Sequence, residues 1–401
     1  MSEAAPTVVI APDSFKGSCS SVEAARAIAR GVRAAFGTRA EVLELPMADG
    51  GEGTLDALVA AWGGEVARVP TSDALGRPRE GRVGYGRTAD GGLRAIIEAA
   101  DANGLPAVSD LPLQPLDADS HGVGELILAA LDAGTDELLL CIGGSATSDG
   151  GAGMLRALGA RLLDAQGRDV AGGARGLLDV QQVDLRGIDP RAARVSWRIA
   201  CDVDNPLTGP RGAAAVFGPQ KGADAQQVAE IERGLGRFSE MLAAAVGTDA
   251  PQLRQQRGIG AAGGLALGLT TLFGAQLVPG ARLVSGAIGL REALAAATLV
   301  FTGEGRLDAQ SLDGKVVSRV LAEAAPGAAV IVLAGSIGLS PEETRAAGIS
   351  AAFSIAQGPA TLEEMSADAT RLLEVTTGQV CGAILAASKR LIPFGGVGVG
   401  V

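Results

Sequence analysis

The sequence predicts an α/β protein of two domains: a Rossmann-like domain with a parallel sheet, formed by both chain ends, and an inserted α/β domain with a mixed sheet. Three observations support this class. The 401 residues suffice for two domains. Near both ends, short apolar runs alternate with glycine-rich loops and helical patterns, as in parallel α/β sheets. Between residues 65 and 100, short alternating runs instead favour an antiparallel meander.

The first two predicted strands, residues 7–11 and 41–45, each lead into a loop that carries charged residues. A helix follows each loop, and the first begins with a capping box of Ser20 and Glu23. Open α/β sheets bind ligands at the carboxyl ends of their strands, so these loops are candidate binding segments. A loop lysine can equally be a solvated cation, and acidic residues also favour helix N-termini. The candidates are Asp13, Ser14, Lys16, Asp49 and Glu52.

The stretch from residue 138 to 158 reads as a strand, a tight glycine-rich loop and a helix. Glycines turn backbone N–H groups inward, and hydroxyls and a helix N-terminus add further donors, which together suit an anion. An ordinary connection between a strand and a helix also favours Gly, Ser and Asp, so both interpretations stay open. The candidate phosphate ligands are Gly143, Gly144, Ser145, Gly150 and Gly151.

Two further strand ends carry charges. Asp202 and Asp204 follow the predicted strand 196–201 and suit Mg²⁺, which takes few carboxylates and keeps its waters, although a turn ahead of Pro206 explains them equally well. After the strand 297–301, charges of both signs crowd into a short segment, which is hard to explain by packing. These residues are Glu304, Arg306, Asp308, Asp313 and Lys315.

The end of the chain returns to the alternation of strands and helices. Strands are predicted at 329–334 and 351–355, and helices at 341–347 and 362–389. A domain built from both termini, with a second domain inserted, is the simplest arrangement. The expected domains are residues 1–70 plus 285–401 and residues 71–284.

Composition excludes several classes of protein. The net charge of −11 without a basic block argues against nucleic acid. One histidine and four scattered cysteines argue against zinc sites and disulfides. The 24 uncharged residues 258–281 contain seven glycines and a proline, and favour a buried loop and helix over a membrane span. The GxGxxG match at 258–263 follows polar residues instead of a strand, which excludes a dinucleotide site. No signal peptide is expected.

Glycine loops, isolated cations and carboxylates at strand ends suit phosphoryl transfer, which needs positioning and charge neutralisation more than a nucleophile. Composition alone does not separate a kinase from a phosphatase or a phosphate-binding protein. The motifs, in order, are IAPDSFKGS (10–18), PMADGGEGT (46–54), GGSATSDGGAGM (143–154), ACDVDNPLTGP (200–210), FGPQKGA (217–223), GAAGGL (260–265) and TGEGRLD (302–308).

This set resembles the type I glycerate kinase family from residue 7 to about 385. The resemblance implies ATP-dependent phosphorylation of (R)-glycerate, commonly at the 2-hydroxyl, to 2-phosphoglycerate and ADP with Mg²⁺. It also implies a cytoplasmic two-domain α/β enzyme with its active site in the cleft between the domains. The partners are then the acid and the nucleotide, without nucleic acid or membrane, and a homodimer is left open.

Roles follow as hypotheses. Lys16 and Arg306 would bind phosphate or the substrate carboxylate, and Asp13, Ser14, Asp49, Glu52 and Lys315 would surround the substrate. Asp202, with Asp204 second, would hold Mg²⁺, and Glu304 or Asp308 would be the base.

The chain departs from the family pattern at His121, Val123 and Asp313, which puts the identity of the acid in doubt more than the reaction. The alternatives are a kinase of the same fold for another small 2-hydroxy acid, phosphorylation at the 3-hydroxyl, and a non-catalytic anion-binding protein.

Overall fold

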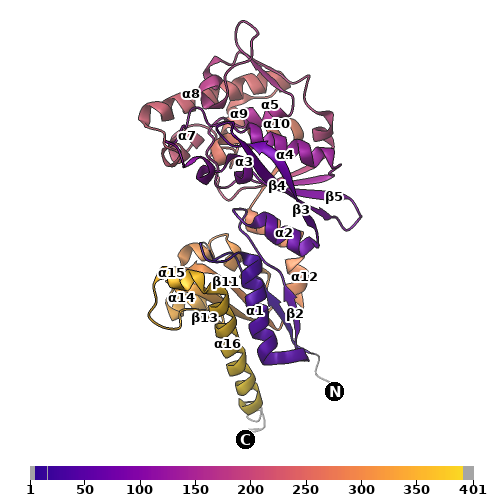
Figure 1. The fold of residues 1–401 in the computed structure, drawn as a ribbon, viewed down its shortest axis with the longest axis vertical. Coiled ribbons are helices and arrows are strands. Elements are labelled where there is room, and N and C mark those ends of the chain that lie inside the picture. Colours follow the sequence, from indigo (N-terminus) through magenta and orange to yellow (C-terminus); the bar gives the residue numbers. More distant parts are fainter. Residues whose placement is uncertain (1–4, 16, 392–401) are drawn as a thin grey trace, which may run out of the picture. The chain divides into compact units, whose positions relative to one another are not determined.

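The computed structural model describes residues 5–15 and 17–391 of the chain. Its contacts divide the chain into two compact units (Figure 1). Unit 1 comprises Met1–Asp49 and Val284–Val401, and unit 2 comprises Gly50–Leu283. Both chain ends therefore contribute to unit 1, with unit 2 inserted between them.

Unit 1 is built on a five-stranded parallel sheet with the strand order β13-β12-β11-β1-β2. The strands are β1 (Thr7–Ile10), β2 (Glu41–Glu44), β11 (Leu299–Leu307), β12 (Ala329–Ile337) and β13 (Ala351–Ser354). The central strands are continuous apolar runs because helices cover both of their faces. The predicted parallel sheet is confirmed.

Two layers of helices cover the sheet of unit 1. The helices α1 (Ser21–Phe36) and α16 (Ala369–Leu391) lie side by side and share a core with Ile331 and Leu333 (Figure 1). On the opposite face, Val332 and Ala334 form a core with α13 and the segment after α14. The remaining helices are α12 (Leu290–Ala295), α13 (Val316–Glu323), α14 (Pro341–Ala346) and α15 (Leu362–Ala367), and α11 (Gly280–Ala287) contains the boundary between the units.

The helices and strands of unit 1 differ from the predicted ones mainly at their ends. Ser20 caps α1, and Glu23 reciprocates by accepting the Ser20 N–H at 2.9 Å. The strands β11 and β12 continue to Leu307 and Ile337, beyond the predicted ends, because Glu304 and Arg306 stay paired with β12. The predicted helix 362–389 is instead two helices, α15 and α16, separated at Asp368.

Unit 2 contains a six-stranded mixed sheet with the order β10-β9-β6-β5-β4-β3. The strands β3, β4 and β5 form the predicted antiparallel meander. The strands β5, β6, β9 and β10 pair in parallel. Their bounds are β3 (Glu65–Ser72), β4 (Pro78–Arg87), β5 (Leu93–Glu98), β6 (Glu137–Cys141), β9 (Ser196–Ala200) and β10 (Gln276–Val278), and β7 (Arg161–Leu163) with β8 (Gln182–Asp184) forms a separate ribbon. The predicted mixed sheet is confirmed.

Helices of unit 2 pack around one large apolar core. They are α2 (Thr54–Trp62), α3 (Ala100–Asn103), α4 (His121–Asp132), α5 (Ala152–Ala157), α6 (Gly173–Gly176), α7 (Ala213–Phe217), α8 (Ala225–Val246), α9 (Ala250–Gln255) and α10 (Leu267–Phe273). The uncharged stretch 258–281 supplies α10, β10 and buried loop residues. Across residues 5–15 and 17–391, no helix has the length and apolarity that a membrane span requires.

The first boundary between the units lies between Asp49 and Gly50, whereas the sequence predicted it at residue 70. Residues 50–70 belong with unit 2 because α2 packs on β4 and because β3 pairs along its whole length with β4. A strand cannot be separated from the sheet that satisfies its backbone groups. The second boundary lies between Leu283 and Val284, next to the expected position.

The contact between α1 and α16 gives a test of the core of unit 1. A Cβ on Gly31 would lie 2.5 Å from the Glu374 carbonyl oxygen and 2.7 Å from Thr377 Cβ. We expect Gly31→Ala to lower the free energy of unfolding by about 1–3 kcal/mol, because the helices must separate. The shift of the thermal unfolding midpoint measures this.

Gly382→Ala is the matched control, since Gly382 lies on the same helix pair and an added Cβ would meet nothing within 4 Å. This variant gains helix propensity of up to about 1 kcal/mol and should unfold at a slightly higher temperature. Equal stabilisation by both substitutions would contradict the close packing of α1 on α16.

Candidate active site

The candidate site of unit 1 lies where its parallel sheet reverses the order of its strands. From β1 the chain moves outward to β2, then returns to the other side of β1 with β11 and continues outward to β12 and β13. At such a reversal, adjacent connections leave on opposite faces and open a crevice at the carboxyl ends of the strands. The loops after β1 and β2 and the end of β11 all reach this edge.

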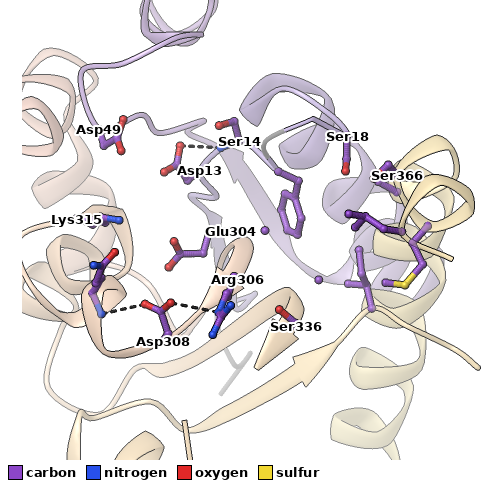
Figure 2. A pocket seen from close by; sticks show the side chains of 18 residues that line it. Asp13, Ser14, Ser18, Asp49, Glu304, Arg306, Asp308, Lys315, Ser336 and Ser366 are labelled. Atoms are coloured by element: carbon purple, nitrogen blue, oxygen red, sulfur yellow. Dashed lines mark hydrogen bonds and ion pairs between the residues drawn. The ribbon is translucent and has the colours of Figure 1, made fainter. Parts of the chain in front are cut away.

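A pocket of about 560 Å³ occupies this edge (Figure 2). Its size is in the range of about 300–1,000 Å³ that small-molecule sites occupy. Seven residues selected from the sequence line it: Asp13, Ser14, Asp49, Glu304, Arg306, Asp308 and Lys315. Lys16 lies outside the described residues. The structure thus brings together charged residues that lie about 300 positions apart in the sequence, such as Asp13 and Lys315.

Glu304 points into the pocket from β11, towards the side on which Asp13, Asp49 and Lys315 lie (Figure 2). It is half-buried, and its Oε1 accepts no hydrogen bond from a described residue. Burial raises the pKa of the Glu304 carboxyl, while the Ser311 hydroxyl and the Lys315 ammonium oppose that rise. A half-buried carboxylate with a raised pKa in the lining of a pocket is a candidate to accept a proton.

Asp308 has a different environment from Glu304. Its Oδ1 accepts the backbone N–H of Gln310 at 2.9 Å and so caps the short helical turn Ala309–Leu312. Its Oδ2 lies 3.3 Å from Arg306 Nε, and the Arg306 side chain is 72% exposed. Of the two carboxylates that the sequence offered as a base, Asp308 is occupied in shaping the loop, which leaves Glu304 as the better candidate.

The sequence analysis missed the rest of the pocket wall. Apolar residues from the loop after β1 and from the segment that runs from the end of β13 to the start of α16 line it: Phe15, Ile355, Leu362, Met365 and Ala369. Hydroxyls come from Ser18, Ser336 and Ser366 (Figure 2). Such residues give no sequence signal, because apolar side chains in helical patterns are usually core. The 81% exposure of Leu362 is visible only in the folded chain.

In unit 2, the glycine-rich loop after β6 divides into an exposed part and a buried part. Gly143 and Gly144 are exposed, and their N–H groups donate to no described residue. Gly150 and Gly151 are buried with positive φ, and their N–H groups donate to the Gly263 carbonyl at 2.9 Å and to Asp149 Oδ1 at 3.1 Å. Only the first part of the loop therefore offers backbone donors to a ligand.

Asp149 takes the place that a bound anion would have at the start of α5. Its buried carboxylate accepts the N–H of Gly153 at 3.1 Å and the Ser120 hydroxyl at 2.7 Å. Burial, together with the nearby Asp119 charge, raises the pKa of Asp149. A carboxylate in this position satisfies the N-terminal N–H groups of the helix from within the protein.

Lys221 supports the same loop, and the sequence analysis gave it no role. Its side chain is only 3% exposed, and its Nζ donates to Ser145 Oγ at 3.1 Å and to the Thr147 carbonyl at 2.5 Å. Burial lowers the pKa of Lys221 to about 7, against the raising effect of Asp149. The glycine loop is thus fixed by a lysine that cannot reach solvent.

The two candidate metal ligands at the end of β9 differ in their contacts. Asp204 forms ion pairs with Arg211 at 2.7 Å and Arg257 at 3.2 Å, which lower its pKa. Asp202 is exposed, and its Oδ1 accepts the Gly280 N–H at 2.9 Å. No group of three or more His, Cys, Asp or Glu residues with metal-binding geometry occurs among the described residues. Glu52 is exposed in unit 2, ahead of α2, and does not line the pocket of unit 1.

The three departures from the expected motifs lie away from the pocket. Val123 is completely buried in the core of unit 2. His121 is exposed at the start of α4, with Nε2 3.8 Å from Glu125 Oε1. Asp313 is exposed in unit 1 but is not among the residues that line the pocket.

Comparisons with known proteins agree with these features. The profile of the Glycerate kinase family matches residues 8–385. The glycerate kinase of Bacillus subtilis (strain 168) is 43% identical over 382 residues, which cover 94% of this chain and 97% of that protein. The glycerate 2-kinase of Escherichia coli (strain K12) is 41% identical over 358 residues, covering 89% of this chain and 92% of that protein.

A crystal structure described as glycerate kinase 2 of Salmonella typhimurium LT2 is similar with a TM-score of 0.84 at 41% identity, covering 96% of this chain and 100% of that one. The similarity therefore extends over both units and includes every loop discussed above. A charged pocket at the strand reversal, a fixed glycine loop and full-length identity of about 40% lead to one assignment: this chain belongs to the glycerate kinase family of phosphotransferases.

Proposed function

We propose that this chain transfers the γ-phosphoryl group of ATP to the 2-hydroxyl of (R)-glycerate, with 2-phosphoglycerate and ADP as products. The observation that carries the proposal is Glu304, a half-buried carboxylate with a raised pKa and an oxygen without a described partner, in a pocket with Lys315 and Arg306. The name of the Escherichia coli relative, glycerate 2-kinase, supports the choice of the 2-hydroxyl.

The charged side of the pocket contains candidate partners for the carboxylate and for the hydroxyls of glycerate. Lys315 or Arg306 would pair with the glycerate carboxylate, and Asp13 and Asp49 would orient its hydroxyls. The 2-hydroxyl oxygen attacks the γ-phosphorus, the bond to the β,γ-bridging oxygen breaks, and Glu304 takes the hydroxyl proton. ADP leaves with the bridging oxygen. The protein contributes mainly orientation and charge neutralisation, as phosphoryl transfer requires.

The glycine loop and Asp202 suit the donor. The exposed N–H groups of Gly143 and Gly144 would bind phosphate oxygens. An exposed single carboxylate, Asp202, fits Mg²⁺, because this ion binds through one or two carboxylates and substrate phosphates rather than an all-protein cage. When bound, Mg²⁺ would neutralise charge on the phosphates. Asp204, held by two arginines, is the weaker candidate.

Glycerate is favoured over another 2-hydroxy acid by the positions of the unusual residues. Val123 lies in the core of unit 2, and neither His121 nor Asp313 lines the pocket. Their identities therefore give no reason to change the acceptor.

A coupled assay of ADP release with a panel of 2-hydroxy acids tests the proposal. We expect turnover with (R)-glycerate at the highest kcat/KM, and ³¹P and ¹³C NMR of the product should place the phosphate on the 2-oxygen. A higher kcat/KM for another acid would reassign the substrate, and a 3-phosphate would reassign the regiochemistry. Without turnover on any acid, only the non-catalytic alternative would remain.

Glu304→Gln removes the base and keeps the shape of the side chain. We expect kcat to fall by about 10²–10⁴-fold, the usual contribution of a general base. In the unmodified enzyme kcat should decline as the pH falls through the raised pKa of Glu304, because only the ionised carboxylate accepts a proton. The variant should lose this acidic limb. A pH–rate profile measures both effects.

Asp313→Asn is the control for that experiment, since Asp313 is also a carboxylate of unit 1 but is exposed outside the pocket. This variant should have an unchanged kcat, and its kcat should still decline at low pH. An acidic limb that persists in Glu304→Gln would assign the proton to another group.

The assignment of Asp202 as a Mg²⁺ ligand is tested by measuring activity as a function of Mg²⁺ concentration at a fixed nucleotide concentration. Asp202→Asn should raise the Mg²⁺ concentration for half-maximal activity by about tenfold or more, because the amide lacks the negative charge that attracts the cation. Asp204→Asn should change it much less, because two arginines already neutralise Asp204. An equal shift in both variants would indicate a general charge effect at this loop.

A further inference from the structure

A buried lysine of unit 2 contacts the glycine-rich loop after β6. Lys221 ends the short helical turn between α7 and α8, and it is only 3% exposed. Its Nζ donates to Ser145 Oγ at 3.1 Å and to the Thr147 carbonyl at 2.5 Å. The lysine therefore holds the segment that directly follows the exposed part of the loop.

Neutral groups fasten the same segment on another side. The Asn103 side-chain amide donates to Thr147 Oγ1 at 3.0 Å, and the Asn103 carbonyl accepts the N–H of Ala146 at 2.7 Å. Hydrogen bonds between neutral groups thus suffice to attach this loop to its surroundings. The positive charge of Lys221 is not required for attachment alone.

A lysine is also a costly residue at this position. Burial lowers the pKa of Lys221 to about 7, because an ammonium group loses its hydration in the interior. A methionine has a side chain of similar length and would fill the space without burying a charge. Packing in unit 2 therefore does not by itself explain a lysine here.

The charges around Lys221 leave room for a further negative group. Asp149, from the same loop, raises the pKa of Lys221 against the effect of burial. Two carboxylates of adjoining segments have other partners: Asp224 caps α8, and Asp110 forms an ion pair with Arg77 at 2.7 Å. An anion bound at the exposed part of the loop would add negative charge near Lys221 and favour its protonated form.

We infer that Lys221 is a positioning residue for the phosphates of the nucleotide. Through Ser145 and the Thr147 carbonyl, it keeps the preceding turn ready for an anion. The N–H groups of Gly143 and Gly144 then bind phosphate oxygens without a cost of reorganisation. The inference rests on the proposed function for the identity of the donor. It goes beyond that function by coupling nucleotide binding to a buried cation and its proton.

The affinity for ADP tests the positioning role without turnover. By isothermal titration calorimetry of the full chain, Lys221→Met should raise the Kd for ADP about tenfold, as for the loss of a charge-assisted hydrogen bond. In steady-state assays its KM for ATP should rise similarly, whereas KM for glycerate should change less than twofold. Gln220→Ala is the matched control, because Gln220 is exposed in the same turn, and it should bind ADP like the unmodified chain.

Ser145→Ala keeps the experiment decisive if Lys221→Met does not fold, since it removes only one of the two contacts of the lysine. It should raise the Kd for ADP about threefold. If both variants fold, the double variant should bind ADP no more weakly than Lys221→Met alone, because the two residues act through one contact.

The proton balance separates a positioning charge from a merely structural residue. Calorimetry in buffers of different ionisation enthalpy, slightly above the pKa of Lys221, measures the protons taken up with ADP. The unmodified chain should take up more than Lys221→Met, because the bound phosphates raise the pKa of Lys221. The titration of ADP itself is common to both chains and cancels.

Two results would overturn the inference. One is an unchanged Kd for ADP and an unchanged proton balance in Lys221→Met. The other is a raised KM for glycerate with an unchanged KM for ATP, which would assign the loop to the acid. If the unmodified chain bound ADP but turned over no acid, the proposed function would fail, and weaker ADP binding by Lys221→Met would still support the role of Lys221.

Discussion

The parallel pairing of β1 with β11 is the contact on which the candidate site depends. It joins residues about 290 positions apart, with Val8 opposite Leu299 and Ile10 opposite Phe301. The loop after β1 continues this pairing, since the N–H of Asp13 donates to the Gly303 carbonyl at 2.8 Å and Thr302 Oγ1 donates to the Ala11 carbonyl at 2.7 Å. These bonds fix the Asp13 loop beside Glu304. Without them, the carboxylates of the pocket would belong to separate segments of chain.

Burial gives carboxylates of similar chemistry different roles in this protein. Glu304 lies in the lining of a pocket, its Oε1 has no described hydrogen-bond partner and its pKa is raised, which makes it the candidate proton acceptor. Asp149 is more deeply buried, but its oxygens accept bonds from Ser120, Gly151 and Gly153, so it serves the loop rather than a ligand. A raised pKa alone therefore does not mark a candidate base, and Glu304 differs from Asp149 in that it lines the pocket.

Lys221 shows how a loop that offers backbone donors can be held in place. Its buried ammonium bonds to Ser145 and to the Thr147 carbonyl, and these residues directly follow the exposed Gly143 and Gly144. Isolated glycines leave a chain conformationally free, and a buried polar contact removes that freedom. This arrangement is consistent with a loop that binds an anion without large reorganisation.

By itself the sequence determined the class of the fold, the strands and loops at the carboxyl edge and most charged residues of the pocket, because apolar periodicity, capping residues and charge placement are local. Resemblance of its motifs gave the family. Tertiary structure alone decided that Glu304 and not Asp308 has an unused oxygen, that Gly150 and Gly151 are occupied internally, and that Leu362 borders a pocket. It also placed residues 50–70 with unit 2. These properties depend on which distant segments exclude water from a side chain or satisfy its hydrogen bonds, and no local pattern encodes that.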